Sequence, residues 1–269
     1  MLKRMGAIAR RVLGPPQMDE TLVSFHLLDK EPRVMVDVGA HHGESLLPYA
    51  DRGWMIHAFE PDPHNRMELE RRTAGRPNIR ISPHAVTTTD GESVSLHTSE
   101  LSTGISTLQP FHSSHRATTS VTTTRLDTYL REHNVRQVGF LKIDAEGHDL
   151  AVLQSFPWND IHPNVVLCEF EDRKTAPQGH TYRDIAAFLI RSGYSVIVSE
   201  WHPITRYGGD HGWRRAVRYP VSLADDAWGN LLGVDPAETR PFMWILRFAG
   251  FRLRMRRWVD WLSGPIHPR

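Results

Sequence analysis

The amino-acid sequence predicts an α/β fold in which a mostly parallel sheet carries helices on both faces. Three observations lead to this prediction. Short apolar runs alternate with segments of helical pattern, which is typical of consecutive β-α-β units. The first of these runs ends in a glycine turn that opens a helix. Several later runs end in an acidic residue, as strands do where they border a ligand crevice.

Composition indicates a globular protein of no extreme class. Hydrophobic residues make up 40% and charged residues 23% of the 269 positions, and the net charge of +1 gives no overall field for nucleic acid. The single cysteine, Cys168, excludes an intramolecular disulfide framework, and its apolar neighbours suggest a core position. No apolar run reaches the roughly 20 residues of a membrane span, and the basic start lacks the apolar stretch of a signal peptide. We therefore expect a cytoplasmic protein.

Two helices are expected before the sheet, in an N-terminal helical segment over residues 1–32. Residues 1–13 form a basic amphipathic pattern that a Gly-Pro-Pro sequence ends. Asp19 is placed to cap a second helix that runs to about Lys30.

The first strand and the turn after it indicate a ligand site. Residues 34–38 are apolar apart from Asp37, as in a parallel strand buried on both faces, and they lead through Gly39 and Gly43 into a helix expected at 44–52. This geometry directs backbone N–H groups toward a polar ligand. Because the Asp37 carboxylate would repel a phosphate, the site suits S-adenosylmethionine better than a dinucleotide.

A second acid supports this interpretation. The strand expected at 54–59 ends at Glu60, about twenty residues beyond the glycine turn, where nucleotide-binding α/β units place the acid that binds ribose hydroxyls. Pro61 and Pro63 stop the strand and favour a helix over 62–73.

The alternation continues to residue 207, with one interruption, so we expect the main domain to span 33–207. Residues 99–120 are rich in Ser, Thr and His, which predicts a long loop that acts as a lid over the cofactor. The other expected elements are a strand from Ile79, a strand over 118–126, a helix from Asp127 to about Glu132, strands over 138–143 and 165–168, a helix over 182–191, and a closing antiparallel pair over 194–199 and 203–207.

Five segments of the main domain resemble a known family. In chain order they are VDVGAHHGE, AFEPDP, TTRLDTYL, LKIDAEGHDLAVLQSF and VVLCEFED. They are similar to motifs of the FkbM family of S-adenosylmethionine-dependent methyltransferases. The resemblance implies a class I, Rossmann-like fold with a seven-stranded sheet, and methyl transfer that is commonly to a hydroxyl oxygen of a sugar or polyketide. Such families usually carry Asn where this chain has His41, and often where it has His84.

Four acids at strand ends define the predicted site: Asp37, Glu60, Asp144 and Glu169. The carboxyl ends of parallel strands face one crevice, so these carboxylates should converge there, unless each only caps the helix that follows. We expect the cofactor to contact Asp37, Gly39, Ala40, His41, Gly43, Glu60, Pro61, His84, Ala85, Asp144, Glu146 and Gly147. We expect Asp144, His148 and Glu169 to be catalytic, with Asp144 or His148 as the general base.

The acids that follow the later strands raise the question of a metal. If Asp144, Glu169, Glu171 and Asp172 lie close together, either their pKa values rise or a cation neutralises them. Mg²⁺ prefers oxygen ligands. Asp144, Glu169 and Glu171 therefore form a candidate Mg²⁺ site.

The C-terminal extension, residues 208–269, contains an apolar stripe at helical spacing, flanked by arginines. The stripe consists of Trp244, Phe248, Phe251, Met255, Trp258, Val259 and Leu262. A helix of this kind packs on its own domain or on a second copy in a homodimer, or it lies on an anionic membrane surface. With the basic N-terminal helix, the second alternative would place the protein at the inner leaflet, beside a lipid-linked acceptor.

The resemblance favours an O-methyltransferase acting on a small molecule or glycan, and the near-neutral net charge gives no reason to expect nucleic acid as the substrate. A nicotinamide-dependent oxidoreductase would need G-x-G-x-x-G, and His41 stands where the second glycine should be. A non-catalytic protein that binds the cofactor as a scaffold is disfavoured because all four strand-end acids are present.

Overall fold

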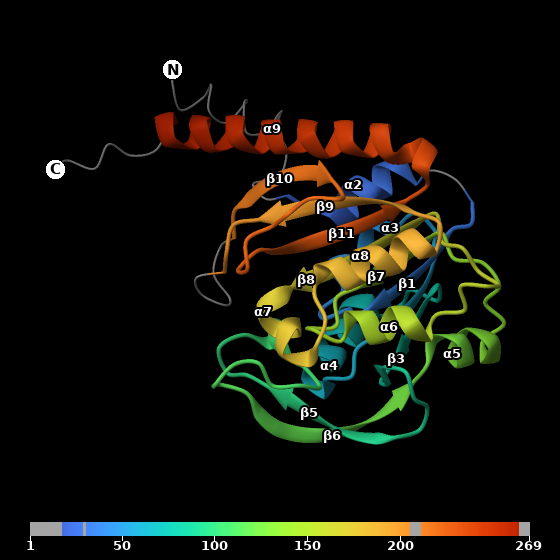
Figure 1. Ribbon diagram of the computed structural model, residues 1–269. Coiled ribbons are helices and arrows are strands. Elements are labelled where there is room, and N and C mark those ends of the chain that lie inside the picture. Colours follow the sequence, from blue (N-terminus) through green and yellow to red (C-terminus); the bar gives the residue numbers. More distant parts are fainter. Residues whose placement is uncertain (1–17, 29–30, 205–210, 264–269) are drawn as a thin grey trace.

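The computed structural model describes residues 18–28, 31–204 and 211–263, and an eight-stranded sheet lies at its centre (Figure 1). The helix expected at residues 1–13 lies outside the described residues. The strand order of the sheet is β10-β9-β11-β8-β7-β1-β2-β3. Five strands pair in parallel: β1 (Val34–Val38), β2 (Met55–Phe59), β3 (Ile79–Ser82), β7 (Phe140–Ile143) and β8 (Val165–Glu171). Three strands pair in antiparallel fashion: β9 (Ser195–Trp201), β10 (Trp213–Arg218) and β11 (Trp228–Val234).

The predicted fold class is confirmed, with one more strand than expected. Without β10, the order is that of the seven-stranded class I methyltransferase sheet that the resemblance implies. β10 adds an eighth strand by pairing with the outer edge of β9. The sheet is parallel from β8 to β3 and antiparallel from β10 to β8.

The closing antiparallel pair is not where we predicted it. β9 covers the first expected member, but its partners are β11 and β10, and Pro203 and Ile204 belong to no strand. Pro203 has no N–H group with which to continue the ladder. Because β10 and β11 belong to the main sheet, the sheet extends beyond residue 207, where we had placed the end of the domain.

Helices cover both faces of the sheet and create two hydrophobic cores. One core lies under α5 (Leu126–Glu132), α6 (Asp149–Ser155) and α8 (Tyr182–Arg191). The other lies under α2 (Glu20–Leu27), α3 (Leu47–Ala50), α4 (Pro63–Thr73) and α9 (Thr239–Ser263). Successive side chains of β1 show how the sheet divides them, since Val36 belongs to the first core and Met35 to the second.

Local signals explain where several helices begin and end. The Asp19 side chain accepts a hydrogen bond from the Leu22 N–H group and caps α2, as predicted. α8 has its predicted bounds and is followed by Gly193, whose φ is +94°. The helix expected from residue 44 starts only at Leu47, because turns occupy the preceding residues. Asp127 lies in the first turn of α5 and binds Arg125 instead of capping the helix.

The buried end of α2 is tied to β9 by hydrogen bonds. The Glu20 carboxylate accepts from the Ser199 hydroxyl at 2.6 Å and from the Trp201 indole at 2.8 Å. The Ser199 hydroxyl in turn accepts from the Trp213 indole of β10. Residues that we had assigned to an N-terminal extension therefore help to hold the edge of the sheet.

A second, smaller sheet carries the predicted lid. Its strand order is β4-β6-β5, formed by β4 (Ala85–Val86), β5 (Ser93–Thr98) and β6 (Arg116–Thr124). The loop between β5 and β6 contains the short 3₁₀ helix η1 (Thr103–Ile105). Because β6 already begins at Arg116, the loop ends earlier than predicted and spans residues 99–115.

The long helix α9 packs along β10 and forms the outermost layer at the top of the molecule (Figure 1). Its inner face buries Phe242, Leu246 and Leu253 in the second core. Gly250 permits a close approach, since a Cβ atom there would lie 1.9 Å from the Trp213 ring. Within the described residues, no helix combines the length and apolar character that crossing a bilayer requires.

The aromatic stripe that we predicted on this helix points away from the core. Trp244, Phe248 and Phe251 are 66%, 47% and 57% exposed. The side chains of the stripe from residue 256 onward lie outside the described part. The helix packs on its own domain, but through a different set of apolar side chains.

The two faces of α9 give a direct test of this packing. Leu246→Ala should lower the free energy of unfolding by about 2–5 kcal/mol, because it leaves a cavity in the core. Phe248→Ala, on the exposed face, should change it by less than about 0.5 kcal/mol. Urea denaturation of the two variants measures both values, and equal losses would show that the assigned faces are wrong.

Candidate active site

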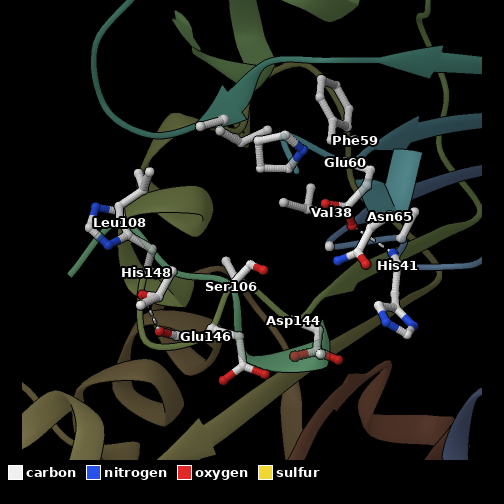
Figure 2. A pocket seen from close by; sticks show the side chains of 18 of the residues that line it. Val38, His41, Phe59, Glu60, Asn65, Ser106, Leu108, Asp144, Glu146 and His148 are labelled. Carbon is white, nitrogen blue, oxygen red and sulfur yellow. Dashed lines mark hydrogen bonds between the residues drawn. The ribbon is translucent and has the colours of Figure 1, made fainter. Parts of the chain in front are cut away.

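A cavity of about 270 Å³ opens at the carboxyl ends of β1, β2 and β7, beneath the lid loop (Figure 2). Ten of the residues predicted for the site line it: Gly39, Ala40, His41, Glu60, Pro61, His84, Ala85, Asp144, Glu146 and His148. Five do not: Asp37, Gly43, Gly147, Glu169 and Glu171. Figure 2 shows Glu60 and Asn65 on one side of the space, and Leu108 and His148 on the opposite side. The cavity thus has two ends of different chemistry.

Glu60 gives the first end a fixed carboxylate. It follows β2 and accepts hydrogen bonds from the His41 N–H group at 2.8 Å and the Asp62 N–H group at 2.9 Å. Its side chain is buried, and burial raises its pKa to about 7, although the two N–H groups oppose this. A carboxylate held in this way can accept hydrogen bonds from a pair of ligand hydroxyls.

The glycine turn brings the ends of β1 and β7 together. Gly39 has φ +77°, and a Cβ atom on it would lie 1.9 Å from the backbone oxygen of Asp144. A larger residue would force the two strand ends apart. Gly43, also at positive φ, faces the Leu69 side chain of α4 instead of the cavity.

Lys142 is a site residue that the sequence analysis missed. Its buried ammonium group lies 3.0 Å from an Asp37 carboxylate oxygen, 3.0 Å from the Gly39 carbonyl oxygen and 3.7 Å from an Asp144 carboxylate oxygen. Burial by itself would lower the pKa of Lys142, but Asp37 and Asp144 raise it above its usual value. The signal was available, because lysine interrupts the otherwise apolar strand FLKI.

Asp37 therefore serves the site through Lys142. Its carboxylate is fully buried, and burial raises its pKa while Lys142 lowers it. We had expected Asp37 to contact the cofactor itself. In the structure it holds the lysine that borders the cavity.

The turn after β7 places two side chains, Glu146 and His148, at the second end of the cavity. Glu146 and Gly147 have φ of +50° and +96°, and the Asp149 carboxylate locks this conformation by accepting hydrogen bonds from the Ala145 and Gly147 N–H groups. Burial raises the pKa of Asp149 to about 6. The next residue after the glycine, His148, directly precedes α6 and lines the cavity.

The His148 imidazole is suited to accept a proton. Its Nδ1 atom is buried and forms no hydrogen bond within the described residues. Burial, together with the nearby His180, lowers the pKa of His148 below its ordinary value, so the ring is neutral at neutral pH. A neutral imidazole that lines a cavity can act as a general base.

A second buried lysine neutralises the acids that we had considered as metal ligands. Lys174, in α7 (Asp172–Thr175), contacts Glu146 at 2.5 Å, Glu171 at 2.9 Å and Glu169 at 3.4 Å. The expected set of Asp144, Glu169 and Glu171 does not come together as a metal site. Two groups among the described residues have suitable spacing, His41 with His42 and Glu44, and Asp144 with Glu146 and Glu169. In the second group, Glu146 and Glu169 already bind the Lys174 ammonium group. Mg²⁺ is not supported.

The cluster around Lys174 holds more carboxylates than cations. Burial raises the pKa of Glu146 to about 7, and it raises that of Glu169 well above its usual value, in both cases against the influence of Lys174. The same carboxylates raise the pKa of Lys174 despite its burial. Glu169 belongs to this cluster, so any effect it has on catalysis acts through Lys174 and Glu146.

The lid loop is fastened across the cavity by side-chain hydrogen bonds. Thr103 bonds to the His41 ring and accepts from the Asn65 amide. The Ser106 hydroxyl donates to Asp62, and the Thr107 hydroxyl donates to the backbone oxygen of Glu146. The lid thus connects the glycine turn, α4 and the turn after β7. Its position over the cavity agrees with the prediction from sequence.

The charges that border the cavity limit what can bind there. Four carboxylate side chains line it, those of Glu44, Glu60, Asp144 and Glu146, against one lysine, Lys142. This surplus of negative charge disfavours phosphate groups and suits a ligand that is cationic or uncharged.

Comparison with known proteins identifies the family. A family model described as the methyltransferase FkbM domain matches residues 37–196, more than half of the chain. The protein belongs to the FkbM methyltransferase family. It is accordingly an S-adenosylmethionine-dependent methyltransferase. No curated protein matches the chain significantly.

Solved structures with a similar fold are distant in sequence. They include precorrin-6y C5,15-methyltransferase from Geobacter metallireducens, with a TM-score of 0.43 and 10% identity over 80% of this chain and 87% of that one. A precorrin 8W decarboxylase from Methanobacterium thermoautotrophicum has a TM-score of 0.43 and 13% identity over 82% and 91% of the two chains. An rRNA methylase from Streptococcus thermophilus has a TM-score of 0.42 and 9% identity over 80% and 93%.

The residues present fit the cofactor that the family uses. Glu60 offers a buried carboxylate to ribose hydroxyls, and the backbone at Gly39 approaches without a side chain. The surplus of carboxylates along the cavity suits the sulfonium and ammonium groups of S-adenosylmethionine.

Replacement of Glu60 tests the cofactor end of the cavity. Glu60→Ala should weaken S-adenosylmethionine binding by about 1.5–3 kcal/mol, the usual contribution of hydrogen bonds to a charged group. Glu70→Ala, on the exposed side of α4, should leave affinity unchanged. Isothermal calorimetry on folded protein measures both. Unchanged affinity in the Glu60 variant would remove this residue from the cofactor site.

The raised pKa of Glu60 adds a pH dependence to this test. Ligand hydroxyls donate to the ionised carboxylate, whereas the group is protonated below its pKa of about 7. Affinity should therefore increase as the pH rises through about 7, and Glu60→Gln should flatten that dependence. An unchanged slope in the variant would assign the titration to another group.

Replacement of Lys174 tests the ion cluster. Lys174→Met should lower the free energy of unfolding by about 3–5 kcal/mol, because it leaves buried carboxylates without a counter-charge. A carboxyl group with a raised pKa in the folded state favours folding below its unfolded pKa, and this contribution disappears as the pH rises through the folded value. The loss should thus be larger at alkaline than at acid pH. Denaturation at several pH values, with Lys174→Arg as the charge-preserving control, decides this.

Proposed function

We propose that the protein methylates a hydroxyl oxygen of an uncharged acceptor, a sugar, glycan or similar small natural product, with His148 as the general base. The observation that carries this proposal is the position of the His148 imidazole. It lines the cavity at the end opposite Glu60 (Figure 2), and its side chain forms no ion pair within the described part of the chain.

A hydroxyl group must lose its proton as its oxygen attacks a methyl group, and a neutral imidazole is the side chain best matched to that task near neutral pH. Bound S-adenosylmethionine supplies the electrophilic methyl group. The protein's share is to orient the acceptor and exclude water. Correct placement of two reactants can contribute roughly 7–11 kcal/mol to lowering a barrier.

The rest of the acceptor end favours a ligand with several hydroxyl groups. Asp144 and Glu146 offer carboxylate oxygens, and the lid contributes Ser106 and Thr107. Hydroxyl-rich molecules can satisfy such groups by donating hydrogen bonds. Phosphate-rich acceptors such as nucleic acids would meet the surplus of negative charge instead.

Asp144 is the second candidate for the base. Its carboxylate lines the cavity but also contacts the Lys142 ammonium at 3.7 Å. We assign it to positioning, because this contact fixes its orientation from the cofactor side. Within the described residues His148 has no comparable contact, which leaves its imidazole available to the acceptor.

His148→Gln should reduce the turnover number about 10²- to 10⁴-fold, with cofactor affinity unchanged. With saturating cofactor, the wild-type turnover number should fall in the acid range, at pH values below the ordinary histidine pKa, because burial lowers the His148 pKa. A panel of sugars and glycans with methyl-labelled cofactor provides the assay, and His64→Gln on the exposed side of α4 is the matched control. Near-normal turnover in the His148 variant, with loss in Asp144→Asn, would move the base to Asp144.

The same assay separates catalysis from simple binding. Cofactor binding without methyl transfer to any acceptor in the panel would favour the non-catalytic scaffold. Transfer to a nitrogen or carbon acceptor only would overturn the assignment to a hydroxyl oxygen.

A further inference from the structure

We propose that the outward face of α9 docks on the surface of an anionic phospholipid bilayer. We define this face by six exposed side chains: Arg240, Trp244, Arg247, Phe248, Phe251 and Arg254. Its three aromatic residues are among only seven exposed large hydrophobic residues in the described part of the chain. The opposite face of the helix is already buried in the core. Packing of the core therefore does not explain the aromatic side chains on the outward face.

A hollow beside the outward face has the chemistry of an anion site. It has a volume of about 700 Å³ and lies between α9 and the end of β10. Arg218, Arg240 and Arg247 line it, together with apolar side chains that include Trp244, and no carboxylate side chain does. None of the three arginines forms an ion pair with a carboxylate within the described residues. Guanidinium groups are well matched to phosphate oxygens, which the headgroups of a bilayer present beside its apolar interior.

The arrangement of the aromatic rings favours a bilayer over a nucleic acid. Trp244 and Phe248 stack on each other with centroids 5.4 Å apart and an interplanar angle of 2°. The Arg252 guanidinium lies 6.0 Å from the Phe248 centroid. Base stacking needs open ring faces, and the stack of Trp244 on Phe248 already occupies one face of each ring. Insertion among lipid headgroups requires exposed aromatic area, which remains available.

The charge of the helix argues against a second copy of this chain. Residues 240–255 contain four arginines and no acidic residue. A two-fold symmetric contact through this face would bring arginine against arginine, which costs free energy. An anionic surface provides the opposite charge instead.

The position of α9 defines what docking would do. The helix forms one outer side of the molecule, and the small sheet with the lid lies at the other (Figure 1). Docking would tether the enzyme and leave the lid side in water. The inference is independent of the acceptor proposed above.

Vesicle sedimentation with the full-length protein tests the proposal without any acceptor or cofactor. The protein should bind vesicles of phosphatidylcholine with phosphatidylglycerol, and not phosphatidylcholine alone, and added salt should weaken binding. Replacing Arg240, Arg247 and Arg254 by Gln should weaken binding about 100-fold, since each arginine near an anionic surface contributes about fivefold. The matched control replaces Arg131, Arg183 and Arg191, exposed on α5 and α8, by Gln and should retain binding.

A variant with Ser in place of Trp244, Phe248 and Phe251 should also lose binding, although its charge is unchanged. Thermal unfolding checks that all variants fold. The proposal is overturned if anionic vesicles do not bind at low salt, or if both arginine sets reduce binding equally. Complete displacement of the vesicles by inorganic phosphate or RNA that carries the same total negative charge would also overturn it. So would sedimentation equilibrium in which the sole effect of the aromatic variant is to convert a dimer to a monomer.

Discussion

The ammonium group of Lys142 is the contact on which the geometry of the site depends. It joins the Asp37 carboxylate of β1, the Gly39 carbonyl group of the glycine turn and the Asp144 carboxylate beyond β7. Removing such charges from water costs several kcal/mol for each ion, and the cost is offset only when every charge finds partners. The Lys142 ammonium group meets that condition because three oxygen-bearing groups surround it. The ends of two neighbouring strands are thereby held in one arrangement, with Gly39 against the backbone of Asp144.

Lys174 repeats this arrangement at the turn after β7, where it binds Glu146. The two lysines together face five carboxylates: Asp37 and Asp144 at Lys142, and Glu146, Glu169 and Glu171 at Lys174. Burial, with a smaller contribution from the neighbouring carboxylates, raises the pKa values of Glu146 and Glu169 even so. Side-chain ammonium groups thus perform the neutralisation for which we had considered a metal ion. They do so without cancelling the negative charge along the cavity, which suits a cationic cofactor.

The general fold could be predicted because each parallel strand has its own apolar run and its own polar end. Because the carboxyl ends of parallel strands lie at the same edge of a sheet, acids at strand ends such as Glu60 and Asp144 come together there, and this does not depend on how the helices pack. β10 was missed because it is an edge strand with three arginines, WRRAVR, that does not look buried. β11 was missed because Gly229 and Gly233 interrupt its apolar run.

Side-chain direction was the part of the site that sequence could not supply. Cys168 points into the core beneath α8, so its neighbour Glu169 faces the other side of the sheet, toward Lys174 and away from the cavity lining. The partners of Lys174 lie on two separate segments, the turn after β7 and the strand β8, and only the folded chain brings them together. In α9 the sequence offers two apolar stripes, and the close fit of Gly250 to the Trp213 ring decides which of them is buried.

α9 lies outside the residues that match the family model, yet it completes the core that the matched residues begin. One side of the helix must be apolar and closely fitted to β10, and this requirement fixes the direction of the other side. The arginines and aromatic rings of that side are therefore presented on a surface that is already folded. A preformed surface loses little conformational freedom when it binds. This is why a helix with so few outward-facing side chains can serve as a docking element while it also stabilises the sheet.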